Sequence, residues 1–400
     1  MTTRSDTFQA KAGRNRGAVR WLTLVCAFGL LVPAVPAQAA PKYGVTSART
    51  PTSTEMSRLT QGNAQMIRTE FRWDDVERDN GHYDGLVASA AAQGRRLLPV
   101  IGGTPEQFVP KPGKYPSGQP FTSNKAAMDR LRGYLRTIVG RYGGPGGTIR
   151  EWQVWNEPNI PQFAAGGKPK AKEYAKLLKI TVTTIRSVDP QAKIVLAGMP
   201  ELTRNGTNMA EYLRELYRVK KIEKLFDVIA IHPYTTDKFG ADGVEGALIR
   251  TRRALKKLGE SRTKLRITET GFGTDGDPRP GFTVSESKQA KLLGQIFKRV
   301  RQEGRSYKVD SVLWFCFRDF DTQNRFWYNF SGLFRQGGDP KPAWSRFTGF
   351  TGGSDGGGAN VGSANKSAEP FAGPFPGVGV DEAAEAERET TANLIPSPPE

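Results

Sequence analysis

Residues 149–159 read IREWQVWNEPN, and this stretch decides how the rest of the chain is interpreted. Its first part, Ile149 to Trp155, has the composition of a buried β-strand, and Glu157 follows where that strand should end. Residues 267–271 read ITETG, so a second carboxylate, Glu269, closes another candidate strand. The chain therefore places two glutamates at the ends of two strands, which makes the order of its strands the first question.

Eight short apolar runs alternate along the chain with longer helical patterns. They are mostly continuous rather than alternating, as expected for parallel strands that are covered on both faces. The candidate strands are Tyr43–Ala48, Met66–Trp73, Leu97–Gly102, Ile149–Trp155, Lys193–Gly198, Asp227–His232, Leu265–Glu269 and Asp310–Phe317.

The helical patterns have apolar residues at spacings of three and four. One helix is indicated by Met128, Leu131, Leu135 and Ile138, and another by Leu293, Ile296, Phe297 and Val300. Thr283-x-x-Glu286 predicts a capping box at the start of the second helix.

The alternation of strands and helices predicts an α/β protein with a single (β/α)₈ barrel over residues 40–350. The alternative is a doubly wound open sheet. That fold usually has a glycine-rich first turn, which residues 43–51 do not contain.

Residues 1–39 have the pattern of a signal peptide. Arg14, Arg16 and Arg20 form a basic segment, an apolar run follows at 21–35, and Ala37–Ala39 is a small-x-small cleavage signal. We expect cleavage near Ala39 and a secreted, extracellular protein. The alternative, an uncleaved membrane anchor, is disfavoured because spanning a bilayer takes about 20 apolar residues.

Residues 351–400 differ in composition from the barrel region. They are rich in Gly, Ser, Ala, Pro and Glu and contain few large apolar residues. Such a segment buries too little apolar surface to offset the entropy lost on ordering, so we predict a disordered tail. We assign it no function.

The net charge of +18 is unevenly distributed. Residues 1–39 contribute +4 and residues 351–400 contribute −6, which leaves +20 for residues 40–350. A body this basic could attract an anionic polysaccharide, an anionic cell wall or nucleic acid, although solvated outer helix faces explain the charge as well. No nucleic-acid-binding motif accompanies the charge. We expect a carbohydrate partner, possibly anionic, and a monomer that binds no nucleic acid and, after signal cleavage, no membrane.

The cysteines and histidines indicate neither a disulfide nor a metal centre. Cys26 would be removed with the signal peptide, and Cys316 lies in an apolar run that favours a buried structural thiol. With only His82 and His232 besides, the mature chain lacks a zinc site of the usual spacing. We expect no metal and no cofactor.

Functional residues of (β/α)₈ barrels lie at the C-terminal ends of the strands, the end here called the mouth. Polar and aromatic residues gather at these ends in this sequence. They are Arg72 on the second strand, Asn156 and Glu157 on the fourth, His232 and Tyr234 on the sixth, Glu269 on the seventh and Trp314 on the eighth.

The sequence here resembles a clan of retaining glycoside hydrolases. These (β/α)₈ barrels carry an Asn-Glu-Pro motif with the acid/base at the end of strand 4, matched by residues 156–158, and a nucleophile at the end of strand 7. Within the clan the chain resembles family 39 or the family 5 cellulase group. Further matching positions are Trp73, Glu77, Gly81, Tyr83 and Asp84, and Gly332, Leu333, Lys341, Pro342 and Ala343.

The resemblance implies roles for both glutamates. Glu157 would protonate the leaving oxygen and later act as a base, and Glu269 would attack the anomeric carbon to form a covalent glycosyl-enzyme. Alternatively, Glu157 could only cap the following segment, and Glu269 could be a structural ion-pair residue.

Further roles are implied for the neighbouring side chains. Asn156 would bind the sugar 2-hydroxyl, His232 and Tyr234 would line the site with Tyr234 bonded to the nucleophile, and Trp314 would form the floor of the sugar subsite. Arg72 would hold the nucleophile ionised. The alternatives are a turn-shaping Asn156, a structural His232, a surface salt bridge for Arg72 and a core position for Trp314.

Three functions are therefore considered. The first is a secreted retaining glycosidase that cleaves a polysaccharide or glycoside. The second is a non-catalytic glycan- or cell-wall-binding barrel, which would usually have lost one of the two carboxylates. The third, a basic cell-wall or nucleic-acid binder, is supported by charge alone.

Overall fold

The computed structural model describes residues 40–277 and 279–355, and the predicted signal peptide lies outside these ranges. Eight parallel strands form one closed barrel in the order of the sequence, so the open-sheet alternative is excluded. The strands are β1 (Lys42–Thr46), β2 (Met66–Arg72), β3 (Arg96–Gly102), β4 (Glu151–Asn156), β5 (Lys193–Gly198), β6 (Val228–Ile231), β7 (Lys264–Ile267) and β8 (Val309–Phe315).

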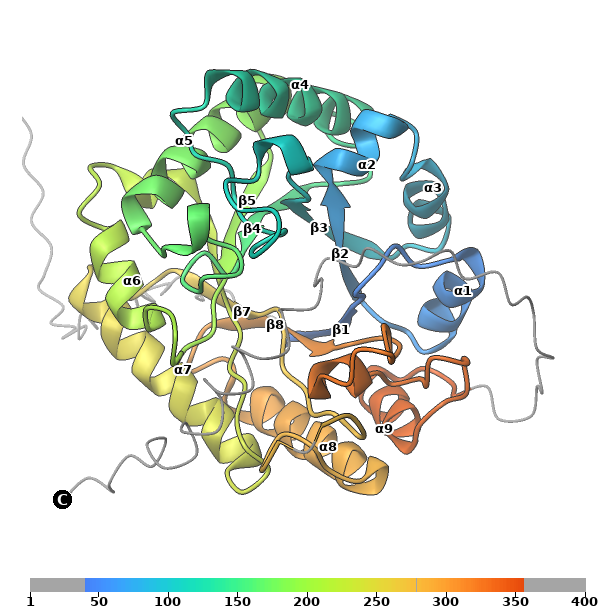
Figure 1. The fold of residues 1–400 in the computed structure, drawn as a ribbon. Helices are drawn as coiled ribbons and strands as arrows, with labels where there is room; N and C mark the ends of the chain where they lie inside the picture. The colour runs from blue at the N-terminus through green and yellow to red at the C-terminus, as the bar shows by residue number, and fades with distance from the viewer. Residues whose placement is uncertain (1–39, 278, 356–400) are drawn as a thin grey trace, which may run out of the picture. The chain divides into compact units, whose positions relative to one another are not determined.

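Helices surround the strands, as Figure 1 shows in a view into the barrel. Short 3₁₀ turns lie at Glu106–Phe108, Ala165–Gly167, Ile222–Leu225 and Trp327–Phe330. The helices are α1 (Ser53–Gln61), α2 (Trp73–Arg78), α3 (Asp84–Ala92), α4 (Lys125–Tyr142), α5 (Ala171–Val188), α6 (Met209–Leu216), α7 (Gly240–Lys257), α8 (Glu286–Glu303) and α9 (Pro342–Thr351).

All eight predicted strands are confirmed, with ends that differ from the predicted ones by at most two residues. The barrel closes because β1 pairs with β2 on one side and with β8 on the other, with Tyr43 opposite Val312. Closure puts the C-terminal ends of all strands at one mouth, so residues far apart in the sequence can meet there.

Two apolar clusters fill the inside and the outside of the barrel wall. Met66, Leu98 and Leu313 belong to a small cluster inside the barrel, whereas Ile67 and Trp314 belong to the large cluster between strands and helices. Neighbouring residues of a strand point to opposite faces. This alternation sets which side chains of β2 and β8 can reach the site.

The predicted helices at α4 and α8 are confirmed, and their apolar stripes are buried. The capping box at Thr283 is wrong. α8 begins at Glu286, and the side chain of Ser285 accepts the hydrogen bond from the Lys288 backbone N–H. Thr283 instead forms a β-bridge with Gly273, which keeps it outside the helix.

The folded part of the chain extends past the predicted boundary at residue 350. Helix α9 ends at Thr351, the backbone N–H of Ser354 donates to the Gln61 carbonyl, and the Asp355 carbonyl accepts from the Trp344 indole. The rest of the predicted tail lies outside the described residues. Within the described ranges, no helix is long and apolar enough to cross a membrane. Cys316 is buried, as predicted.

Candidate active site

Glu157 reaches the mouth through an unusual backbone at the end of β4. Trp155 has φ of 72° and Glu157 has φ of 39°. Residues other than glycine rarely adopt this left-handed region, at a cost of about 1–3 kcal/mol each, and such residues cluster at functional sites. The Glu157 N–H donates to the Gly198 carbonyl on β5, which anchors this turn.

The Glu157 side chain lies in a buried environment without a salt-bridged cation among the described residues. One of its oxygens, Oε1, lies 2.5 Å from Nδ1 of His232. Burial raises the pKa of Glu157 to about 8, and the charge of Arg68 opposes this rise only in part. Glu157 is therefore protonated at neutral pH, which is the state that a general acid requires.

His232, next to β6, is fully enclosed and links the two glutamates. Its Nε2 lies 2.9 Å from the Thr268 hydroxyl and 3.6 Å from Oε1 of Glu269. Burial lowers the pKa of His232 to about 3, although the charge of Glu269 raises it, so the ring is neutral. In a neutral imidazole one nitrogen donates and the other accepts, so the ring can orient Glu157 without adding a positive charge.

Glu269 lies just beyond β7 and is held by donors at both oxygens. Arg68 Nη1 donates to Oε1 at 2.7 Å, and the Tyr234 hydroxyl donates to Oε2 at 2.8 Å. The predicted contact of Tyr234 with Glu269 is thus present. Burial, followed by the charge of Glu269, raises the pKa of Tyr234 well above its usual value, so the phenol stays a donor. A cation and a hydroxyl stabilise negative charge on Glu269.

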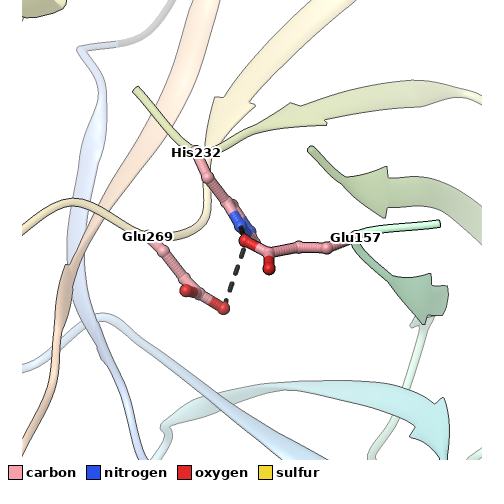
Figure 2. A group of neighbouring side chains, drawn as sticks. All are labelled: Glu157, His232 and Glu269. Carbon is pink, nitrogen blue, oxygen red and sulfur yellow. Dashed lines mark hydrogen bonds and ion pairs between the residues drawn. The ribbon is translucent and has the colours of Figure 1, made fainter. Parts of the chain in front are cut away.

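The two carboxylates converge on His232, as Figure 2 shows. One ligand atom from each of Glu157, His232 and Glu269 lies within 4.8 Å of the others, a grouping that could hold a metal ion. Both ring nitrogens of His232 are, however, engaged with Glu157 and Thr268, and a metal would have to displace those hydrogen bonds. The arrangement is better suited to proton transfer by Glu157 than to metal binding.

The contact predicted for Arg72 is wrong, because Arg68 donates to Glu269 instead. Arg72 lies four residues beyond Arg68, at the end of β2. It donates to both oxygens of Asp74, at 2.9 and 2.6 Å. Arg68 also donates to Gln153 and to Oδ1 of Asn156. The cation therefore sits deeper in the barrel than the sequence analysis placed it.

The role predicted for Trp314 is also wrong. Its side chain is fully buried beside Phe272 in the layer between strands and helices, and its indole donates to the Ser331 carbonyl. Because side chains alternate along a strand, Phe315 takes the opposite face of β8. Trp327 instead packs its ring edge-on against that of Tyr234, which donates to Glu269, with the ring centroids 5.8 Å apart.

Asn156 lines a small hollow beside the nucleophile's arginine. Its Oδ1 is bound by Arg68, whereas its buried Nδ2 has no partner among the described residues. Glu70, on β2, lines the same hollow. A free amide donor next to the catalytic pair fits the expected contact with a sugar hydroxyl.

The sequence analysis missed four residues of the site: Arg68, Glu70, Thr268 and Trp327. For the first two a signal existed, because Met66, Arg68 and Glu70 lie two apart on β2 and therefore share one face. A charged residue inside an apolar strand is informative when its face is known. No pattern in the sequence indicates that Trp327, in a loop after β8, packs against Tyr234.

The chain is similar in sequence to two β-xylosidases. No family model matches the chain. A β-xylosidase from Caldicellulosiruptor saccharolyticus is 29% identical over 166 residues, which are 37% of this chain and 30% of the relative. A β-xylosidase from Geobacillus stearothermophilus is 25% identical over 243 residues, 56% of this chain and 45% of the relative. The chain thus matches less than half the length of either curated relative.

Solved structures show the same fold. A family 39 glycoside hydrolase from Bacteroides cellulosilyticus superposes with a TM-score of 0.58 at 20% identity, covering 78% of this chain and 64% of that protein. A glucosidase from Croceicoccus marinus gives 0.57 at 14% identity, over 79% of this chain and 67% of that one. The two β-xylosidases and the shared barrel fold support the resemblance to glycoside hydrolases that residues 156–158 indicated.

Proposed function

We propose that this protein is a glycoside hydrolase that retains the anomeric configuration, with Glu157 as acid/base and Glu269 as nucleophile. One observation carries the proposal: a buried, cation-free carboxyl and a doubly hydrogen-bonded carboxylate lie at the mouth with oxygens within 4.8 Å. Two carboxyl groups in such different surroundings are a common sign of an acid and nucleophile pair.

The separation of the carboxyls favours retention. Retaining enzymes place the two groups about 5–5.5 Å apart, whereas inverting enzymes leave about 6.5–9.5 Å for a water molecule. One oxygen of Glu157 and one oxygen of Glu269 lie within 4.8 Å of each other. This proximity supports direct attack by Glu269 on the anomeric carbon.

Glu157, Glu269 and their supporting residues have distinct roles in the two steps of the proposed reaction. Glu157, protonated beside His232, gives its proton to the leaving oxygen while Glu269 forms a bond to the anomeric carbon. Glu157 is then a base and takes a proton from the water that releases the sugar. Arg68 and Tyr234 hold the attacking carboxylate in place and stabilise its charge before the attack.

For the substrate we propose a β-linked glycoside or polysaccharide, because two sequence relatives are β-xylosidases. The matched part of the chain is too short a share of those proteins to transfer their substrate directly. From the signal-peptide pattern of residues 1–39 we propose that the protein is exported. We also propose that it is a monomer.

The alternative of a non-catalytic glycan-binding barrel is disfavoured by one fact. A binding protein needs no protonated carboxyl beside a fixed carboxylate, and both Glu157 and Glu269 are present with their supports. Glycan binding alone does not require this pair of carboxyl groups.

The test is hydrolysis of a panel of aryl β-glycosides, neutral and acidic, by the purified protein and by Glu157→Ala and Glu269→Ala. We expect the wild type to cleave at least one glycoside and proton NMR to show the β-anomer as the first product. A wild type that cleaves nothing, or a Glu269→Ala variant of equal activity, would overturn the proposal. An α-anomer as the first product would overturn the retaining mechanism.

A further inference from the structure

Glu70 is a third carboxylate that points into the barrel near the catalytic pair. It lies two residues beyond Arg68 on β2, so both side chains occupy the inner face of the barrel wall. Its carboxylate rests against the end of β3, where a Cβ atom on Gly102 would come within 1.9 Å of Glu70 Oε1. The position of the carboxylate therefore depends on a glycine at residue 102.

The Glu70 carboxylate has acceptor capacity to spare. Its contact with Arg72 Nη1 is 3.4 Å, long for a charge-assisted hydrogen bond, which is usually about 2.7–2.9 Å. No shorter hydrogen bond reaches it from the described part of the chain. Arg72 is instead bound closely to Asp74, at 2.6 Å. A carboxylate with free lone pairs lining a hollow needs donors from elsewhere.

A second unpaired group lines the same hollow. Nδ2 of Asn156 is buried without a partner, while Glu70, Arg68, Ser47 and Asn156 together line the space. The hollow therefore offers a free donor and a free acceptor beside Arg68, which holds the nucleophile. Hydroxyl groups both donate and accept, so adjacent sugar hydroxyls would satisfy both groups at once.

We propose that Glu70 selects the sugar ring whose glycosidic bond is cleaved. It would accept hydrogen bonds from the free hydroxyls of that ring and repel rings that carry an anionic substituent. This inference rests on the proposed glycosidase function and deepens it. A negatively charged ring would meet Glu70 in addition to Glu269. Arg68 is already bound by Glu269 and Asn156, and Arg72 is already bound by Asp74. The subsite thus takes a neutral, unsubstituted sugar, although the barrel as a whole is basic.

The surroundings of Glu70 support this role. Burial raises its pKa to about 7, Asp74 and Asp75 add to the rise, and Arg72 and Arg68 oppose it. Around neutral pH the group therefore exchanges between an acceptor and a carboxylic acid that both donates and accepts. Either form can bind a hydroxyl, but the ionised form repels an anion more strongly.

The experiment pairs Glu70 variants with substrates that lack single hydroxyls. For the aryl β-glycoside that the wild type cleaves best, kcat/KM is measured with its monodeoxy analogues for the wild type, Glu70→Gln, Glu70→Ala and Glu211→Gln. Glu211 is an exposed acid on α6 and serves as the matched control. Circular dichroism and thermal unfolding show whether each variant is folded.

We expect one deoxy analogue to lose about 10- to 100-fold in kcat/KM with the wild type and with Glu211→Gln. With Glu70→Ala that loss should disappear, while the losses for other hydroxyls remain. Glu70→Gln should also lower the preference for a neutral glycoside over the matching uronide. A Glu70→Ala variant that weakens every substrate by one common factor, or changes none, would overturn the inference.

A second variant moves the carboxylate without removing it. Gly102→Ala places a methyl group where the Glu70 carboxylate lies, so it should reproduce the deoxy-sugar pattern of Glu70→Ala. Calorimetric binding of the same glycosides to Glu157→Gln variants, with and without Glu70→Ala, measures selection without hydrolysis. If binding depends on Glu70 but the wild type hydrolyses no glycoside, the proposed function alone is overturned. If the wild type hydrolyses glycosides but selection does not depend on Glu70, this inference alone is overturned.

Discussion

Both ends of the barrel contain glutamates and arginines, but the two ends differ in how these residues are paired. At the end where the strands begin, here called the basal end, Arg266 on β7 donates to Glu151 on β4 at 2.7 Å and to both oxygens of Asp310 on β8. Arg96 on β3 adds a second donor to Glu151, at 3.1 Å. Each basal carboxylate therefore has a close arginine.

At the mouth, the same strands β4 and β7 lead to Glu157 and Glu269, but no arginine of the described residues forms an ion pair with Glu157. Arg68 is committed to Glu269, and Glu157 is left with a neutral histidine. Arginine lowers the pKa of Glu151 against the effect of burial, whereas burial raises that of Glu157 to about 8.

The difference teaches that the number of cations per carboxylate, more than residue type or burial, separates structure from chemistry in this barrel. Paired carboxylates stay ionised and join strands. An unpaired one keeps its proton at neutral pH and can give it away. Glutamates of one strand, six residues apart, thus take on different tasks.

The largest expected effect comes from removing the proton of Glu157. Glu157→Gln should lower kcat by about 10²- to 10⁴-fold on a glycoside with a poor leaving group. Glu151→Gln, on the same strand, should leave kcat per folded molecule near the wild-type value. Steady-state kinetics with active protein quantified by circular dichroism measures both, and equal losses would erase the contrast between the two ends.

Replacing the basal arginine, Arg266, should affect stability, whereas replacing Arg68 at the mouth should affect activity. Arg266→Met leaves Asp310 without its arginine and leaves Glu151 with Arg96 alone. It should lower the free energy of unfolding by about 3–5 kcal/mol, measured by urea denaturation. Arg68→Met should lower kcat by about 10²- to 10³-fold because the donor to Glu269 Oε1 is lost. If Arg266→Met proved as inactive per folded molecule as Arg68→Met, the basal end would not be purely structural.

The pH dependence of stability should have opposite signs for Glu157 and for the basal carboxylates. The folded state holds the Glu157 proton up to about pH 8, against an ordinary pKa of 4.5. The unfolded chain releases this proton earlier, so the free energy of unfolding should fall as pH rises through this interval, by at most ~1.4 kcal/mol per pH unit.

The lowered pKa values of Glu151 and Asp310 act in the other direction, because their contribution is present above their ordinary values of 4.5 and 3.8 and is lost in acid. Urea denaturation over a range of pH values tests both signs. Glu157→Gln should flatten the decline from weakly acidic to mildly basic pH, and Glu151→Gln should flatten the acid side. A Glu157→Gln variant with the wild-type slope would show that Glu157 is ionised in the folded protein.

The smallest expected effect is that of Tyr234→Phe. Loss of the hydroxyl that donates to Glu269 Oε2 should lower kcat about tenfold, in line with one hydrogen bond to a charged group. The control is Tyr174→Phe, which removes a buried hydroxyl bound to the Val154 carbonyl on β4. That variant should lose stability and little activity, and the reverse result would contradict the assigned roles.

Much of the fold was readable from the sequence because its signals are local. Each strand is a run of apolar residues and each helix a spacing of three and four, so eight strands and their order could be predicted without contacts. The Asn-Glu-Pro motif then located Glu157 at a strand end. The capping box at Thr283 failed because Ser285 competes for the same helix start and a β-bridge holds Thr283 elsewhere.

The sequence by itself therefore determined the barrel and the two glutamates at its mouth. Only the tertiary structure decided that Arg68 rather than Arg72 reaches Glu269, a contact across 201 residues of sequence, and that Trp314 faces the helices. It also decided that Glu157 is protonated, because a pKa depends on which charges lie nearby in space. Patterns along the chain record propensity and burial, whereas partners, facing directions and protonation states are set when distant strands close into one barrel.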